Sequence, residues 1–78
     1  MQRPKSKQRD PIPLARRADR LYHRAWRLEE RKESHAAHVW FFWSALYKRA
    51  YIGLVHGDTR AYKELRRNLK NPPELLAV

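Results

Sequence analysis

The chain has 78 residues, enough for one small domain, and its 18 Lys and Arg against 8 Asp and Glu give a formal net charge of +10. Three Trp, four Tyr and two Phe are too much apolar surface to leave in water, which excludes a wholly disordered chain. A domain of this size buries too little surface for a deep catalytic cleft. The absence of cysteine excludes disulfides, thiolate zinc sites and thiol catalysis.

Residues 1–12 predict a flexible basic arm. Residues 1–13 hold three of the five prolines, and four cations precede the first acid at Asp10, namely Arg3, Lys5, Lys7 and Arg9. Two interpretations stay open: a solubilising tail or leader, and an arm that lies along phosphates and orders on binding. No apolar run follows this basic start, as a secretion signal would require, so we expect a cytoplasmic protein.

Residues 13–71 predict a helical domain. The first helix is expected to begin near Pro13 or Leu14, and its apolar residues recur in steps of four and three, which makes one stripe: Leu14, Ala18, Leu21, Ala25 and Leu28. The only candidate break before Ile52 is Glu33-Ser34, where Ser34 could cap a new helix. Two arrangements stay open: helices 14–32 and 35–56 folded back on one another, or one helix of about 40 residues whose seam another chain covers.

The segment from His35 to His56 is apolar on nearly every side, which predicts the central helix of the fold. His38, Lys48 and Arg49 interrupt it before about 18 clean residues, so we expect no membrane span. One face is the expected core: Val39, Phe42, Trp43, Leu46, Ala50 and Leu54. A second set contacts the third helix or forms an exposed strip for a protein partner or a second copy: Phe41, Ala45, Ile52 and Val55.

Gly57 suits the left-handed position after a helix, and Asp58 or Thr59 suits the next N-cap. A third helix is therefore expected over about 59–70, with one apolar face: Ala61, Tyr62, Leu65 and Leu69. Asn71-Pro72-Pro73 ends it, and residues 72–78 form an apolar tail. The predicted fold class is all-α, a small three-helix bundle or helical hairpin with an N-terminal basic arm.

An arginine row is the strongest functional signal. At about 100° per residue, five arginines of the first helix fall within one arc opposite the apolar stripe: Arg16, Arg20, Arg24, Arg27 and Arg31. A solvated face normally mixes charge signs, whereas these spacings join like charges, which costs stability unless an anion neutralises them. The third helix extends the basic surface with Lys63, Arg66, Arg67 and Lys70. Twelve Arg against six Lys favour phosphates and bases over a generic anionic surface.

No catalytic residue, metal site or cofactor is expected. His35 and His38 lie three residues apart, but no nearby carboxylate or cysteine completes a metal shell. The chain has no glycine-framed nucleophile and no phosphate-cradling loop. We therefore expect a non-catalytic protein that binds the phosphate backbone of RNA or DNA, as a small subunit or accessory factor of a nucleoprotein assembly. The alternative is a phage- or plasmid-type interaction module that binds an acidic protein surface. A larger protein or a second copy of the chain is a further possible partner.

Overall fold

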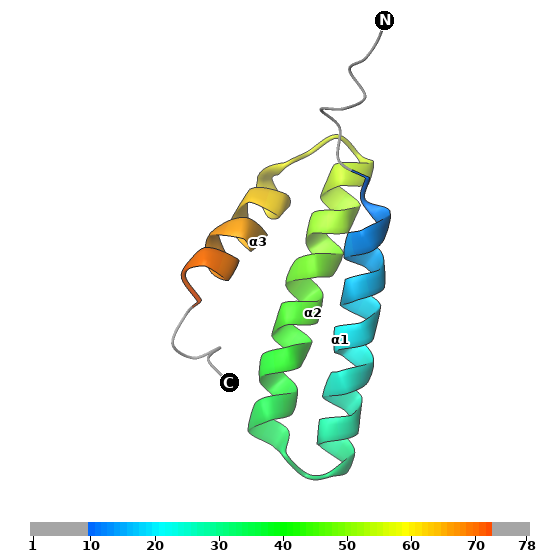
Figure 1. Ribbon diagram of the computed structural model, residues 1–78, viewed down its shortest axis with the longest axis vertical. Coiled ribbons are helices and arrows are strands. Elements are labelled where there is room, and N and C mark those ends of the chain that lie inside the picture. The colour runs from blue at the N-terminus through cyan, green and yellow to red at the C-terminus, as the bar shows by residue number, and fades with distance from the viewer. Residues whose placement is uncertain (1–9, 73–78) are drawn as a thin grey trace, which may run out of the picture.

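The computed structural model describes residues 10–72. It contains three helices, α1 (Ile12–Glu30), α2 (Ser34–Val55) and α3 (Arg60–Lys70), which confirms an all-α three-helix bundle (Figure 1). The arrangement with two separate helices is the one adopted, and α1 and α2 lie antiparallel as a hairpin. The predicted arm cations Arg3, Lys5, Lys7 and Arg9, and tail residues 73–78, lie outside the described residues.

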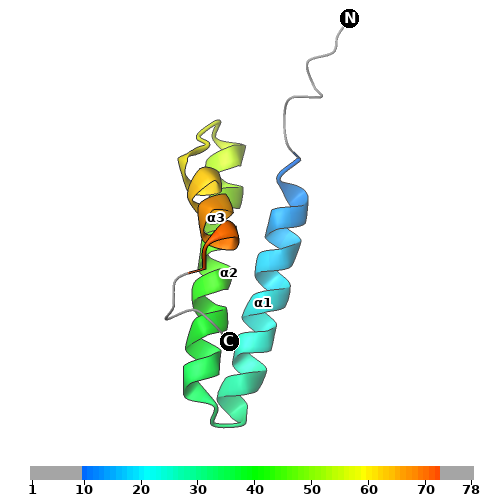
Figure 2. The ribbon, with the colours of Figure 1, turned by 60° about the vertical axis from the view of Figure 1, so that its left-hand side comes forward.

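Helix α2 is the centre of the bundle, as its all-round apolar sequence predicts. Helices α1 and α3 both pack on α2, whereas no Cα atom of α1 comes within 8 Å of one of α3 (Figures 1 and 2). The buried core therefore joins residues of all three helices: Ala18 of α1, Leu65 of α3, and Val39, Trp43, Leu46, Tyr47 and Ala50 of α2. Leu65, only 1% exposed, is the residue through which α3 enters this core.

Small side chains let α1 and α2 approach closely. Ala18 and Ala25 of the predicted stripe are buried at the seam, and the buried Ser44 donates a 2.8 Å hydrogen bond to the backbone carbonyl of Ala18. At one edge of the seam, Phe41 packs edge-to-face on Tyr22 and Trp26, with ring centroids 5.6 and 5.5 Å away. Phe41 thus contacts α1, and the interpretation that placed it against the third helix is wrong for this residue.

Phe42 does not belong to the core, contrary to the sequence prediction, because it is 47% exposed. Helix α3 has 11 residues against the 22 of α2, so it covers only part of the side on which Phe42 lies. The predicted apolar face of α3 is also incomplete: Leu65 is buried, but Leu69 is 49% exposed. The short third helix leaves part of α2 uncovered.

Both interhelical turns end their helices in the same way. After α1, Glu33 N–H bonds to Leu28 O at 3.0 Å and Lys32 N–H bonds to Glu29 O at 2.9 Å, which is a Schellman motif. After α2, Gly57, with φ of 80°, holds the equivalent left-handed position, as predicted. Lys32 has a φ of 64°, so the break depends on a strained lysine. Ser34 is therefore not the cap: it is the first residue of α2, and Glu33 precedes it.

Replacing Lys32 with glycine is expected to stabilise the domain, because glycine adopts a positive φ without a Cβ clash. We expect the Lys32→Gly variant to gain about 0.5–1 kcal/mol, a rise of a few degrees in Tm, measured by circular dichroism during heating. The Lys32→Ala control removes the same charge but keeps a Cβ, and is expected to gain nothing. Equal melting temperatures for the two variants would contradict a strained turn.

Candidate nucleic-acid interface

The arginine row lies on the exposed side of α1. Helix periodicity places these side chains away from Ala18 and Ala25, the residues that face α2. All five are exposed, four within the helix and the fifth at its C-cap: Arg16, Arg20, Arg24, Arg27 and Arg31. The five arginines therefore form one cationic edge along α1, about 22 Å long at 1.5 Å per residue.

No carboxylate within residues 10–72 forms an ion pair with this row. The acid–base contacts found in that range are Asp58 with Arg60, at 2.8 Å, and Asp19 with His23, at 3.7 Å, which is an ion pair only when His23 is protonated. Asp19 is an acid within α1, and its pair partner is a histidine on the following turn. None of the five guanidinium groups of the row is thus ion-paired within the part of the protein that the structure describes.

Arg60 shows what a neutralised arginine of this protein looks like. Its guanidinium donates hydrogen bonds to both oxygens of Asp58, the shortest being 2.8 Å, and its backbone N–H donates to Asp58 Oδ1 at 3.0 Å. The side-chain hydrogen bond from Arg60, followed by the backbone one, lowers the pKa of Asp58 from 3.8 to about 2. Asp58 precedes Thr59, the N-cap of α3, and its bond to the backbone N–H of Arg60 holds the start of the helix, so the pair has a structural role.

Two arginines of α1 lie over aromatic rings of α2. The guanidinium carbon of Arg24 is 5.0 Å from the centroid of the Trp40 ring, and that of Arg17 is 5.8 Å from the Tyr47 ring. On α3, the guanidinium of Arg66 lies 5.8 Å from the Tyr62 ring. Such contacts hold a guanidinium in place without neutralising its charge.

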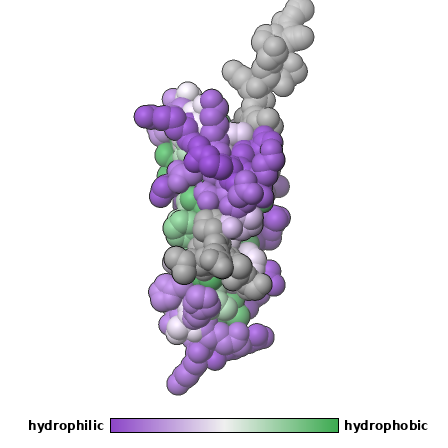
Figure 3. All heavy atoms as spheres, turned by 90° about the vertical axis from the view of Figure 1, so that its left-hand side faces the viewer, coloured by the Kyte–Doolittle hydropathy of each residue, from purple (hydrophilic) through white to green (hydrophobic). Residues whose placement is uncertain are grey.

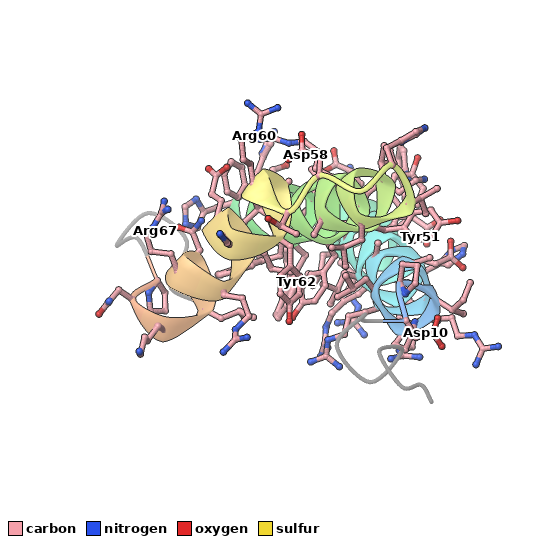
Figure 4. All side chains as sticks on the ribbon, turned by 90° about the horizontal axis from the view of Figure 1, so that it is seen from above. Asp10, Tyr51, Asp58, Arg60, Tyr62 and Arg67 are labelled. Carbon is pink, nitrogen blue, oxygen red and sulfur yellow. The ribbon has the colours of Figure 1, made fainter. Side chains whose placement is uncertain are left out.

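Four cations of α3 share one broad face, about 100° wide, opposite the buried Leu65. Tyr62 projects into the space between α3 and α1, whereas Arg67 points away from α1 (Figure 4). Lys63, Arg66, Arg67 and Lys70 are all exposed, and hydrophilic side chains dominate the upper part of the face that α3 presents (Figure 3). These four cations line a groove that extends to Leu54 of α2 and to Pro11 at the start of α1. The groove therefore connects the basic surface of α3 with the first turn of α1.

The proposed protein-interface residues divide into two groups. Phe41 is partly covered by Tyr22 and Trp26, whereas Ala45, Ile52 and Val55 are exposed, the last two at 45% and 53%. Ala45 also lines a second hollow at the seam of α1 and α2. The strip thus continues beyond the area that α1 covers.

Two further properties were searched over residues 10–72. No three His, Asp or Glu side chains there come together as a metal-binding group. None of the three helices combines the length and the apolar character needed to cross a bilayer.

No family model, curated protein or solved structure matches this chain.

Sequence reasoning missed Arg17 and the two α2 rings that carry arginines, Trp40 and Tyr47. Arg17 lies outside the predicted row, and its ring partner, Tyr47, is 30 residues away along the chain. No spacing within one helix therefore predicts this pair. Tyr62 and Arg66, in contrast, are four residues apart on one helix, a spacing that brings side chains together. That pair was readable from the sequence.

Removing the Arg60 side chain is expected to raise the pKa of Asp58 from about 2 toward 3.8, because its side-chain hydrogen bond lowers that pKa most. The folded-state pKa lies below the unfolded value, so this pair stabilises the fold above about pH 3.8 and ceases to do so as the pH falls through about 2. An NMR titration of the Asp58 carboxyl carbon in Arg60→Gln measures the change. Arg67→Gln is the matched control and should leave the titration as in the parent protein; an unchanged pKa in Arg60→Gln would refute the pairing.

Proposed function

We propose that this chain is a non-catalytic nucleic-acid-binding protein, a small subunit or accessory factor of a nucleoprotein assembly, that contacts the phosphate backbone through the arginine row of α1. The observation that supports this proposal is the absence of any ion pair between the row and a carboxylate within residues 10–72. Five like charges along one edge repel one another, and a polyanion relieves that repulsion.

Arginine suits this role better than lysine. The planar guanidinium binds phosphate oxygens with two parallel hydrogen bonds, which fixes orientation as well as charge. The groove at α3 adds four cations next to the start of α1, so a backbone that follows the row meets a second basic surface. Contacts of this kind bind without reading base sequence.

Binding should weaken steeply with salt, because each neutralised phosphate releases condensed counterions. The logarithm of affinity should fall linearly with the logarithm of salt concentration, and Arg20→Gln/Arg27→Gln should make that slope shallower by about 1.5, or about 0.7–0.9 per lost contact. Fluorescence anisotropy of labelled RNA and DNA, repeated over a series of salt concentrations, measures both quantities.

The control variant Lys48→Gln/Arg49→Gln removes the same charge from exposed positions of α2, outside the row. It should leave the slope nearly unchanged. An equal effect of both double variants would show that net charge alone drives binding and would refute the row as the contact surface. Failure to bind either RNA or DNA at low salt would overturn the proposed function and favour an acidic protein surface as the partner.

A further inference from the structure

The three arginines that lie over aromatic rings differ from the rest of the basic surface. Arg17, Arg24 and Arg66 are exposed, yet the guanidinium carbon of each lies 5.0–5.8 Å from the centroid of a protein ring, and Arg66 also donates a 3.5 Å hydrogen bond to the Tyr62 hydroxyl. Arg20 and Arg27, on the same helix as the first two, have no such ring among the contacts of residues 10–72. We name Arg17, Arg24 and Arg66 the stacked arginines.

The rings beneath the stacked arginines belong to one region of the core. Tyr47 is a member of the buried cluster that includes Leu65, and both Trp40 and Tyr62 pack against that cluster. Trp40 and Tyr47 are seven residues apart on α2, so they lie about 20° apart around the helix and about 10 Å apart along it. The stacked arginines therefore sit on the side of the bundle where α1 and α3 both flank α2.

This side carries cations without nearby acids of α1. At about 100° per residue, Asp19, Glu29 and Glu30 lie about 120° or more around the helix from Arg17 and Arg24. The other exposed aromatic pair, Tyr22 and Trp26, lies on the acidic side, where carboxylates repel phosphate. Aromatic rings and unopposed positive charge thus coincide at the stacked arginines.

A guanidinium over a ring has one covered face and one that remains open to a ligand. An unpaired base can stack on the open face, while the N–H groups at the edge of the same guanidinium bind the neighbouring phosphate. A double helix cannot use this arrangement, because its bases are already stacked and paired. Positive charge alone would bind both forms, so the stacked arrangement is what distinguishes them.

We propose that the stacked arginines bind a single-stranded stretch of nucleic acid, each guanidinium lying between its aromatic ring and an unpaired base. This inference rests on the proposed function and adds to it the class of nucleic acid and the residues that select it. The arginine row supplies general attraction to phosphate, and the stacked arginines supply preference for unpaired strands.

Substitution of lysine for arginine separates stacking from charge, since lysine keeps the positive charge but lacks the planar guanidinium group on which a base can stack. We expect Arg17→Lys/Arg24→Lys/Arg66→Lys to bind a labelled single strand of about 20 nucleotides at least about tenfold more weakly than the parent protein. Its affinity for a duplex of the same length should fall by a smaller factor, because the charge stays and a duplex offers no unpaired base to stack on the arginines. Anisotropy titrations at one salt concentration measure both.

The matched control is Arg20→Lys/Arg27→Lys/Arg31→Lys, which makes the same chemical change at arginines of the row that lie over no ring. Because the row contacts phosphate in paired and unpaired strands alike, this control should change the affinities for the single strand and for the duplex by the same factor. Thermal melts of both triple variants check that the fold is retained, and affinities are compared at a temperature at which every variant is folded.

The outcomes separate the two proposals. If both triple variants change the ratio of single-strand to duplex affinity equally, or the parent protein prefers the duplex, the stacked arginines do not select unpaired strands, although the proposed function stands. If the parent protein binds neither form at low salt, the proposed function fails and this inference fails with it. A selective loss in the stacked-arginine variant supports both.

Discussion

The structure depends on the burial of α2 between two helices whose backbones stay apart from each other. This helix is apolar on nearly every side, so one partner cannot cover it, and α1 and α3 pack on different sides. The resulting core is small, and it uses Ala18 and Ala25 to bring α1 close and Leu65 to hold α3. Because α1 and α3 each pack their apolar face on α2, their polar faces point outward and carry most of the charge.

That outward charge is distributed unevenly. Asp58 pairs with Arg60 at the start of α3, and Asp19 contacts His23, so neither acid forms an ion pair with the arginine row. In a small domain, repulsion within a row of like charges lowers the free energy of unfolding, so the row does not help the chain to fold. A polyanionic partner gives it a physical reason.

The packing of α2 also shapes the basic surface. Aromatic residues that fill the core between α1 and α3 extend to its edge, where arginines of both flanking helices lie over them. One set of rings therefore stabilises the bundle and positions guanidinium groups. Under the proposed function, core and binding surface share these residues, and rings beneath stacked arginines would not be replaceable by aliphatic residues of similar size.

The sequence by itself determined an all-α fold, the apolar stripe of α1, the left-handed turn at Gly57 and the arginine row, because each follows from spacing within one helix or one turn. It left open whether residues 14–56 form one helix or two. It did not reveal that the chain turns at Lys32 between α1 and α2, since a lysine in the sequence does not indicate a positive φ. Nor did it show that Phe42 is exposed or that Arg17 lies over Tyr47. Those features depend on where α3 ends and on how α1 is placed on α2, which are distances between helices and are decided only when the three helices pack together.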